Sequence, residues 1–259
     1  MLFFTLFFFL FGCQDEKPSV ATNDQIVDSY LYKKSVDAVD AEEAATPFES
    51  LPPASTDSLS YGDTKLDIGK VRLNLKQHFD NGSITIDSVK TVFAEQLTDK
   101  LIPYWYGTPW SFEGHTAIPK KGRIACGYFI STTLRDMGLK LNRYKLAQKS
   151  PIDEAKVISC GAPITSITQS DSKEAFLELN RLTTDGIYFI GFDKSHVGYL
   201  LKKRGKLFLV HSNYLSPTSV CIERLEDSRV FESFSTFHLV DISNNELLLA
   251  NWLGNEPIF

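Results

Sequence analysis

The stretch IACGYFISTTLRDMG, residues 124–138, predicts a helix that carries a cysteine in its first turn. Five of its residues recur at the three- and four-residue spacing of a helix face turned toward a core, namely Phe129, Ile130, Thr133, Leu134 and Met137. Gly138 is placed to end the helix, because glycine adopts the left-handed conformation that closes helices. The other segments are interpreted in relation to this helix.

Cys126 is the first candidate for chemistry. At the N-terminus of a helix, unpaired backbone N–H groups favour a thiolate and lower the pKa of the thiol. The same N–H groups are suited to hold a developing oxyanion. The alternative is a buried, inert side chain, which is how cysteines most often occur.

Composition separates an acidic segment from a nearly neutral remainder. The 259-residue chain is 43% hydrophobic and carries a net charge of −5. Residues 14–67 contain 12 acidic and 4 basic side chains, so the acidity is concentrated there. The remainder is close to neutral, which gives no reason to expect nucleic acid as a partner.

The N-terminus has the features of an export signal. Residues 1–13 (MLFFTLFFFLFGC) are too short to span a bilayer as a helix and suit the apolar region of a secretory signal. Residues 10–13 (LFGC) resemble the lipobox of bacterial lipoproteins, which implies that residues 1–12 are removed and Cys13 is lipidated. We therefore expect a membrane-anchored lipoprotein of the bacterial cell envelope, either periplasmic or surface-exposed.

Two further segments complete the expected domain organisation. Residues 13–67 are rich in Asp, Glu, Ser, Thr, Ala and Pro and predict an acidic, flexible tether. Residues 68–259 have enough apolar content for a single folded domain. Residues 71–75 (VRLNL) alternate like a strand or a loop edge.

Helices are predicted first and strands later, which indicates an α+β fold. Helices are expected from about residue 87 to residue 101, after residue 124, around Leu146, after Ser170 or Ser172, and over residues 246–253. Strands are expected over residues 186–192, 195–201, 206–212, 220–225 and 237–242, as an antiparallel meander.

Apart from Cys13, three cysteines remain. One disulfide and one free thiol is the simplest arrangement outside the cytoplasm, and the pair would be Cys160 with Cys221. Three free thiols are equally compatible with the sequence.

Two histidines fall at facing ends of a predicted hairpin. His196 begins one strand, His211 ends the next, and Arg204-Gly205 forms the turn, so the imidazoles become cross-strand neighbours. A base and the residue that orients it need this arrangement. Asn213 would face the same way and is the alternative orienting residue. The chain lacks Cys-x-x-Cys and His-x-x-x-His spacings, so neither a metal site nor a cofactor is predicted.

In order and spacing, four motifs resemble the NlpC/P60 cysteine peptidases: GTPWSF (107–112), CGYF (126–129), HVG (196–198) and His211. The resemblance covers roughly residues 97–213. It implies a papain-like α+β fold, cleavage of peptides in the bacterial cell wall, Cys126 as nucleophile, His196 as general base and His211 as orienting residue. The aromatic cluster and the residue after the nucleophile would bind substrate, namely Tyr104, Tyr106, Trp110, Phe112 and Gly127.

The sequence departs from this family at its specificity positions. An acidic residue usually precedes the cysteine and a serine follows it, whereas this chain has Ala125 and Gly127; Trp110 replaces the usual tyrosine. We therefore expect a cysteine peptidase or amidase acting on a cell-wall or related peptide. The alternatives are a CHAP-type amidohydrolase that uses Asn213, and a catalytically degenerate, peptide-binding surface lipoprotein.

Overall fold

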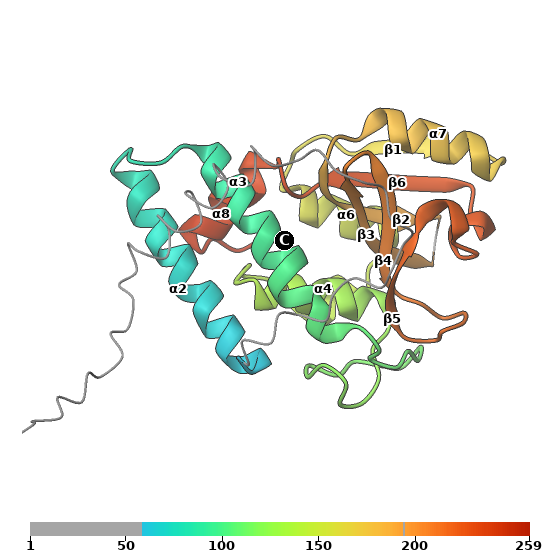
Figure 1. The fold of residues 1–259 in the computed structure, drawn as a ribbon, viewed down its shortest axis with the longest axis horizontal. Coiled ribbons are helices and arrows are strands. Elements are labelled where there is room, and N and C mark those ends of the chain that lie inside the picture. The colour runs from blue at the N-terminus through green and yellow to red at the C-terminus, as the bar shows by residue number, and fades with distance from the viewer. Residues whose placement is uncertain (1–58, 194) are drawn as a thin grey trace, which may run out of the picture.

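A computed structural model describes residues 59–193 and 195–259 as an α+β fold with one antiparallel sheet (Figure 1). The expected signal (residues 1–12), the lipidation site Cys13 and the tether up to residue 58 lie outside the described residues. Within the described part, none of the helices combines the length and apolar character needed to cross a membrane.

The helices come mainly before the strands, as the sequence predicts. The first part contains α2 (Tyr61–Asp80), α3 (Ile86–Glu95), a π-helical turn (Gln96–Leu101), a 3-10 turn (Ile102–Trp105), α4 (Cys126–Asp136), α5 (Arg143–Ala147) and α6 (Pro151–Ser159). Helix α7 (Ser172–Leu182) follows β1, and α8 (Glu246–Gly254) ends the chain. The sequence analysis did not predict α6 or the short strand β1 (Thr165–Thr168).

The sheet has the strand order β1-β6-β2-β3-β4-β5, with every pair antiparallel. Strands β2 (Gly186–Phe192), β3 (His196–Lys203), β4 (Lys206–Ser212) and β5 (Val220–Arg224) form the expected meander. Strand β6 (Thr236–Asp241) does not extend it, because β6 inserts between β1 and β2.

Both faces of the sheet are covered. One face contributes Phe189, Val197, Tyr199 and Val210 to a large core shared with α2, α3, α4, α6 and α8. The opposite face contributes Tyr188, Ile190, Leu200 and Leu209 to a smaller core that includes Ala175 and Leu179 of α7. The alternation of these residues follows from the two-residue period of a strand.

Helix α4 has the boundaries and the buried face that its sequence predicts. Phe129, Ile130, Thr133, Leu134 and Met137 are all fully buried. Gly138 follows the helix with φ of +94°, the left-handed conformation expected of a closing glycine. A hydrogen bond of 2.7 Å between Thr133 Oγ1 and Tyr199 Oη fixes the middle of α4 on β3.

The prediction for residues 71–75 was wrong, because they lie inside α2. Ile68, Val71 and Leu75 are buried at helical spacing, whereas Leu73 is 64% exposed. Ser60 caps the helix by accepting a hydrogen bond from the Asp63 N–H. The domain boundary expected at residue 68 therefore falls within a helix, and the folded part begins by residue 60.

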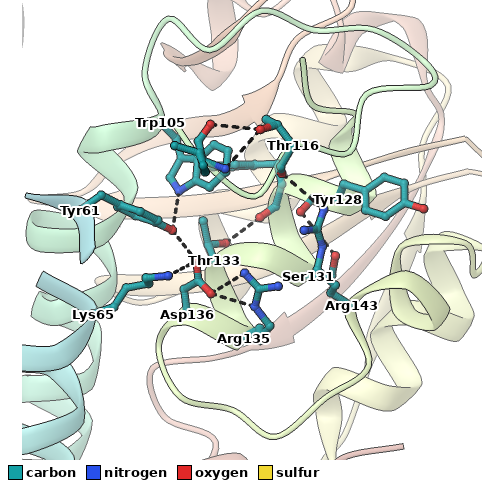
Figure 2. A network of polar contacts seen from close by, with 12 residues as sticks. Tyr61, Lys65, Trp105, Thr116, Tyr128, Ser131, Thr133, Arg135, Asp136 and Arg143 are labelled. Carbon is teal, nitrogen blue, oxygen red and sulfur yellow. Dashed lines mark hydrogen bonds and ion pairs between the residues drawn. The ribbon is translucent and has the colours of Figure 1, made fainter. Parts of the chain in front are cut away.

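A polar network joins α2 to the C-terminal end of α4 (Figure 2). Asp136, which is 8% exposed, accepts a 2.7 Å hydrogen bond from Tyr61 and pairs with Arg135 at 2.6 Å. Trp105 Nε1 donates to the Tyr61 oxygen at 3.0 Å. These contacts place α2 in the same folded unit as the cysteine helix.

Candidate active site

Cys126 is the first residue of α4, with Ala125 at the N-cap position. The residue as a whole is partly exposed, whereas its thiol is desolvated. The next residue, Gly127, lies against the backbone of α5. A Cβ at position 127 would be only 2.7 Å from the carbonyl oxygen of Ala147, so a larger residue does not fit. The serine common in the resembled family would not fit here without movement of α5.

The end of β4 holds the backbone before Cys126 in place. Ser212 Oγ donates a 2.7 Å hydrogen bond to the Ile124 carbonyl oxygen, and Ser212 is fully buried. Because Ser212 follows His211 directly, this bond ties the cysteine segment to the strand that carries the second histidine.

The two predicted histidines form a buried pair. His196 Nε2 lies 2.8 Å from His211 Nδ1, and the side chains are 1% and 0% exposed. The register pairs Tyr199 with Val210, which brings Gly198 opposite His211 and makes His196 its diagonal neighbour. Since Gly198 has no side chain, the two imidazoles are free to approach across the strands.

Glu223 of β5 extends the pair. Its Oε1 atom is 3.2 Å from His211 Nε2, although the two are not aligned for a good hydrogen bond. Burial raises the pKa of Glu223, but the neighbouring His211 imidazole and the Ser228 hydroxyl, which donates to Oε1, outweigh burial and hold the pKa below its ordinary value. A carboxylate only accepts, so it favours the proton of neutral His211 on Nε2. His211 Nδ1 then accepts from His196 Nε2–H, and the lone pair of His196 is on Nδ1.

The electrostatic environment of Cys126 differs from the expectation of a lowered thiol pKa. Desolvation raises the pKa of Cys126 to about 11, and the nearby carboxyl of Glu154 adds to the rise. The backbone N–H groups of Val197, Gly127 and Cys126 itself lower the pKa, as expected at a helix N-terminus, but burial is the larger effect. Burial and His211 also lower the pKa of His196 well below its ordinary value. A neutral thiol and a neutral imidazole are therefore favoured at rest.

The Cys126 thiol contacts a backbone N–H group at the start of β3 and not the imidazole of His196. Among the described residues, Cys126 Sγ has hydrogen-bond contact with the Val197 N–H but has none with His196. His196 packs against Phe192 and Phe234, on the α7 face of the sheet, whereas α4 covers the opposite face. The structure thus brings His196 and His211 together and leaves the thiol beside the residue that follows His196.

Tyr214 is an aromatic neighbour of both His196 and Trp110. Its ring centroid is 5.4 Å from that of His196 and 6.1 Å from that of Trp110. Burial raises the pKa of Tyr214, and the proximity of Cys126 raises it further. Trp110, predicted to bind substrate, therefore borders the site through Tyr214.

The other predicted substrate-binding aromatics lie in different places. The Tyr104 hydroxyl donates to the Leu59 carbonyl at 2.6 Å and lies 2.9 Å from Thr64 Oγ1, so it faces α2 rather than the site. Tyr106 packs against the core near Cys221, and burial raises its pKa. Phe112 is 79% exposed.

The structure also decides between alternatives that the sequence left open for Asn213 and for the cysteines. The Asn213 side chain accepts from the Leu215 N–H at 2.7 Å and contacts the Ser216 carbonyl, so it orders its own loop instead of His196. Cys160 and Cys221 are free thiols. Cys160 is the C-cap of α6, which packs on β2 and β6. Cys221 is on β5, three strands away from β2 at about 4.8 Å per strand, so the two cysteines are too far apart to form a disulfide.

Sequence analysis missed Glu154, a buried acid beside the site. Glu154 is 1% exposed and its Oε1 atom has no hydrogen-bond partner. Desolvation raises its pKa well above the ordinary carboxyl value, which favours the neutral acid. Glu154 lies in the first turn of α6, which begins at Pro151, and acidic residues at that position are usually solvated. The local sequence therefore gives no indication that Glu154 is buried.

Neither a protein-family model, nor a curated protein, nor a solved structure matches this chain. The resemblance to NlpC/P60 peptidases and the papain-like fold therefore stay predictions.

Proposed function

We propose that this protein is a thiol hydrolase, a cysteine peptidase or amidase, with Cys126 as nucleophile, His196 as general base and His211 as the residue that orients it. The observation that carries the proposal is the buried His196–His211 pair, 2.8 Å apart, at the strand end beside the cysteine helix. Burying two imidazoles is costly unless they are paired, and an imidazole backed by a second imidazole and a carboxylate is a suitable oriented base.

The raised pKa of Cys126 and the lowered pKa of His196 disfavour a preformed thiolate, so the proposal requires proton transfer during attack. As Cys126 Sγ bonds to the substrate carbonyl carbon, its proton passes to His196 Nδ1, and the carbonyl oxygen gains the negative charge. The N–H groups of Cys126 and Gly127 at the α4 terminus are available to stabilise that oxyanion. His196 then protonates the leaving amine, and water hydrolyses the thioester to restore the thiol.

This mechanism requires a rearrangement before chemistry, because His196 packs on the α7 face of the sheet while α4 covers the opposite face. Because the resting thiol has no hydrogen bond to His196 among the described residues, binding of substrate must bring the two groups into contact. Tyr214 and Trp110 lie beside the histidine pair and offer aromatic surface to a peptide. The cell-wall substrate and the lipid anchor at Cys13 are proposed from the sequence motifs alone.

A catalytically degenerate, peptide-binding lipoprotein is the second candidate. The raised pKa of Cys126 and the absence of a thiol–imidazole hydrogen bond among the described residues favour it. Under this alternative the fold and the aromatic border would remain useful for binding, while the histidine pair would serve stability.

The deciding experiment is digestion of cell-wall stem peptides by the full chain, followed by mass spectrometry. We expect cleavage by the wild type and by Cys160→Ala, and none by Cys126→Ala, with all three folded by circular dichroism. Unchanged cleavage by Cys126→Ala would exclude the thiol mechanism. Binding of the peptides without cleavage by the wild type would favour the degenerate binding protein.

A further inference from the structure

A second group of reactive side chains lies behind the histidine pair, on strands β4 and β5. Register places Cys221 directly opposite His211, and Glu223 follows two residues later on the same face. The ligand atoms of His211, Cys221 and Glu223 all lie within 4.8 Å of one another. Imidazole, thiolate and carboxylate together are a donor set that suits Zn²⁺.

The central atom of this group lacks a hydrogen-bond partner. His211 Nε2 is fully buried and has no well-aligned hydrogen bond within the described part of the chain, although Glu223 Oε1 lies 3.2 Å away. Its other nitrogen, Nδ1, is bonded to His196. A histidine that binds metal through one nitrogen usually has the other fixed by a neighbour, as here.

We infer that His211 Nε2, Cys221 Sγ and the Glu223 carboxylate form a Zn²⁺ site with a fourth, solvent-facing position. Three protein ligands and one open position are a common zinc arrangement. The donor atoms lie within 4.8 Å of one another and must draw together to reach zinc bond lengths of about 2.0–2.3 Å. Cys221 and Glu223 are half-buried, so the ion can enter from their side. Coordination transfers one proton, from Cys221 Sγ to solvent.

Occupation of this site would switch off the base, a consequence that rests on the proposed function. With Zn²⁺ on Nε2, the remaining proton of His211 must lie on Nδ1 and be donated to His196 Nε2. His196 would then carry its own proton on Nδ1 and have no lone pair for the thiol. No proton is gained or lost by the two imidazoles, since each shifts its proton between ring nitrogens.

Metal binding is tested first, without any assay of turnover. Metal-depleted full chain is titrated with Zn²⁺ against a chromophoric chelator, and with Co²⁺ to detect a thiolate-to-metal charge-transfer band. We expect one ion per chain and a band that survives in Cys126→Ser and Cys160→Ser. Cys221→Ser should abolish the band, and Glu223→Gln should weaken Zn²⁺ binding about 10–100-fold.

Two results would overturn the site: no stoichiometric binding by the wild type, or binding that is lost in Cys126→Ser and kept in Cys221→Ser. Glu223→Gln, at a half-exposed side chain, keeps the test valid should Cys221→Ser misfold. The switch is tested separately: Zn²⁺ should suppress peptide cleavage by the wild type and leave cleavage by Cys221→Ser unchanged. If the wild type cleaves nothing, the proposed function fails while the metal titration still decides the site.

Discussion

His196 Nε2 and His211 Nδ1 approach to 2.8 Å in a fully buried contact between diagonal neighbours on two strands. A short contact between two ring nitrogens requires that one nitrogen carries a proton and the other does not. The pair therefore has a defined tautomer, which Glu223 at the far side of His211 selects. The orientation of the candidate base depends on residues from three adjacent strands.

Replacing His211 tests this orientation directly. In His211→Asn, the side-chain carbonyl is expected still to accept from His196 Nε2–H. Cleavage should therefore weaken by less than the roughly 10²–10⁴-fold that a positioned base contributes, and remain detectable. His211→Leu has no acceptor and should lose more activity than His211→Asn. The measurement is kcat on the same peptide, with thermal melting to confirm folding; equal activity in both variants would remove the orienting role.

The absence of a side chain at position 198 permits the contact between the histidines. A Cβ there would lie 3.2 Å from His211 Cβ and 3.0 Å from Leu209 Cδ1. We expect Gly198→Ala to displace His211, lower kcat and cost about 1–3 kcal/mol in unfolding free energy. Gly69→Ala in α2, where a Cβ meets nothing within 4 Å, is the control and should keep activity. Full activity in Gly198→Ala would contradict the prediction, because it would show that neighbouring side chains accommodate the added methyl group without displacing His211.

Local patterns predicted much of this fold. Strands β2 and β4 match the predicted ranges because apolar runs are bounded by turns, and α4 matches because its buried face and closing glycine agree. Residues 71–75 failed because Val71, Leu73 and Leu75 also alternate with a period of two, while the helix cap at Ser60 and the partner α8 lie outside the segment.

The site was predictable only where one hairpin defined it. His196 and His211 flank a single turn, so their contact followed from local sequence. Glu223 and Cys221 lie beside His211 because of the register between β4 and β5. Glu154 lies near the site because of the packing of α6. The sequence around His211 contains no signal for either arrangement. The pKa of Cys126 was predicted in the wrong direction because burial depends on the whole domain.

Alkylation of Cys126 should follow the raised pKa of its thiol. With a pKa of about 11, the thiolate fraction rises about tenfold per pH unit at lower pH, and iodoacetamide reacts with the thiolate. We expect the rate to increase steadily between pH 7 and pH 9 without a plateau, measured by mass spectrometry of the Cys126 peptide. Rapid modification that persists below pH 7 would instead establish a stabilised thiolate.

The network at Asp136 should make α2 part of the cooperative unit. Tyr61→Phe removes the 2.7 Å hydrogen bond to a buried carboxylate. Hydrogen bonds to charged groups contribute about 1.5–3 kcal/mol, so we expect a loss of that size in the free energy of unfolding by urea. Leu73→Ala, on the exposed face of α2, should change little. An unchanged free energy for Tyr61→Phe would mean that α2 unfolds independently.

Glu154 should make the domain less stable as pH rises. Its pKa is raised in the folded state, so above the ordinary value of 4.5 the unfolded chain releases this proton first. The unfolded state then binds fewer protons than the folded state, and the free energy of unfolding falls by up to about 1.4 kcal/mol per pH unit until the folded pKa is reached. Glu154→Gln cannot ionise and should lose this decline, so that it is the more stable protein at neutral pH; Asp153→Asn, at an exposed neighbour whose pKa is lowered, should keep it. Urea denaturation between pH 5 and pH 8 measures the slopes. Parallel slopes for wild type and Glu154→Gln would show that Glu154 gains a partner or water that keeps it ionised.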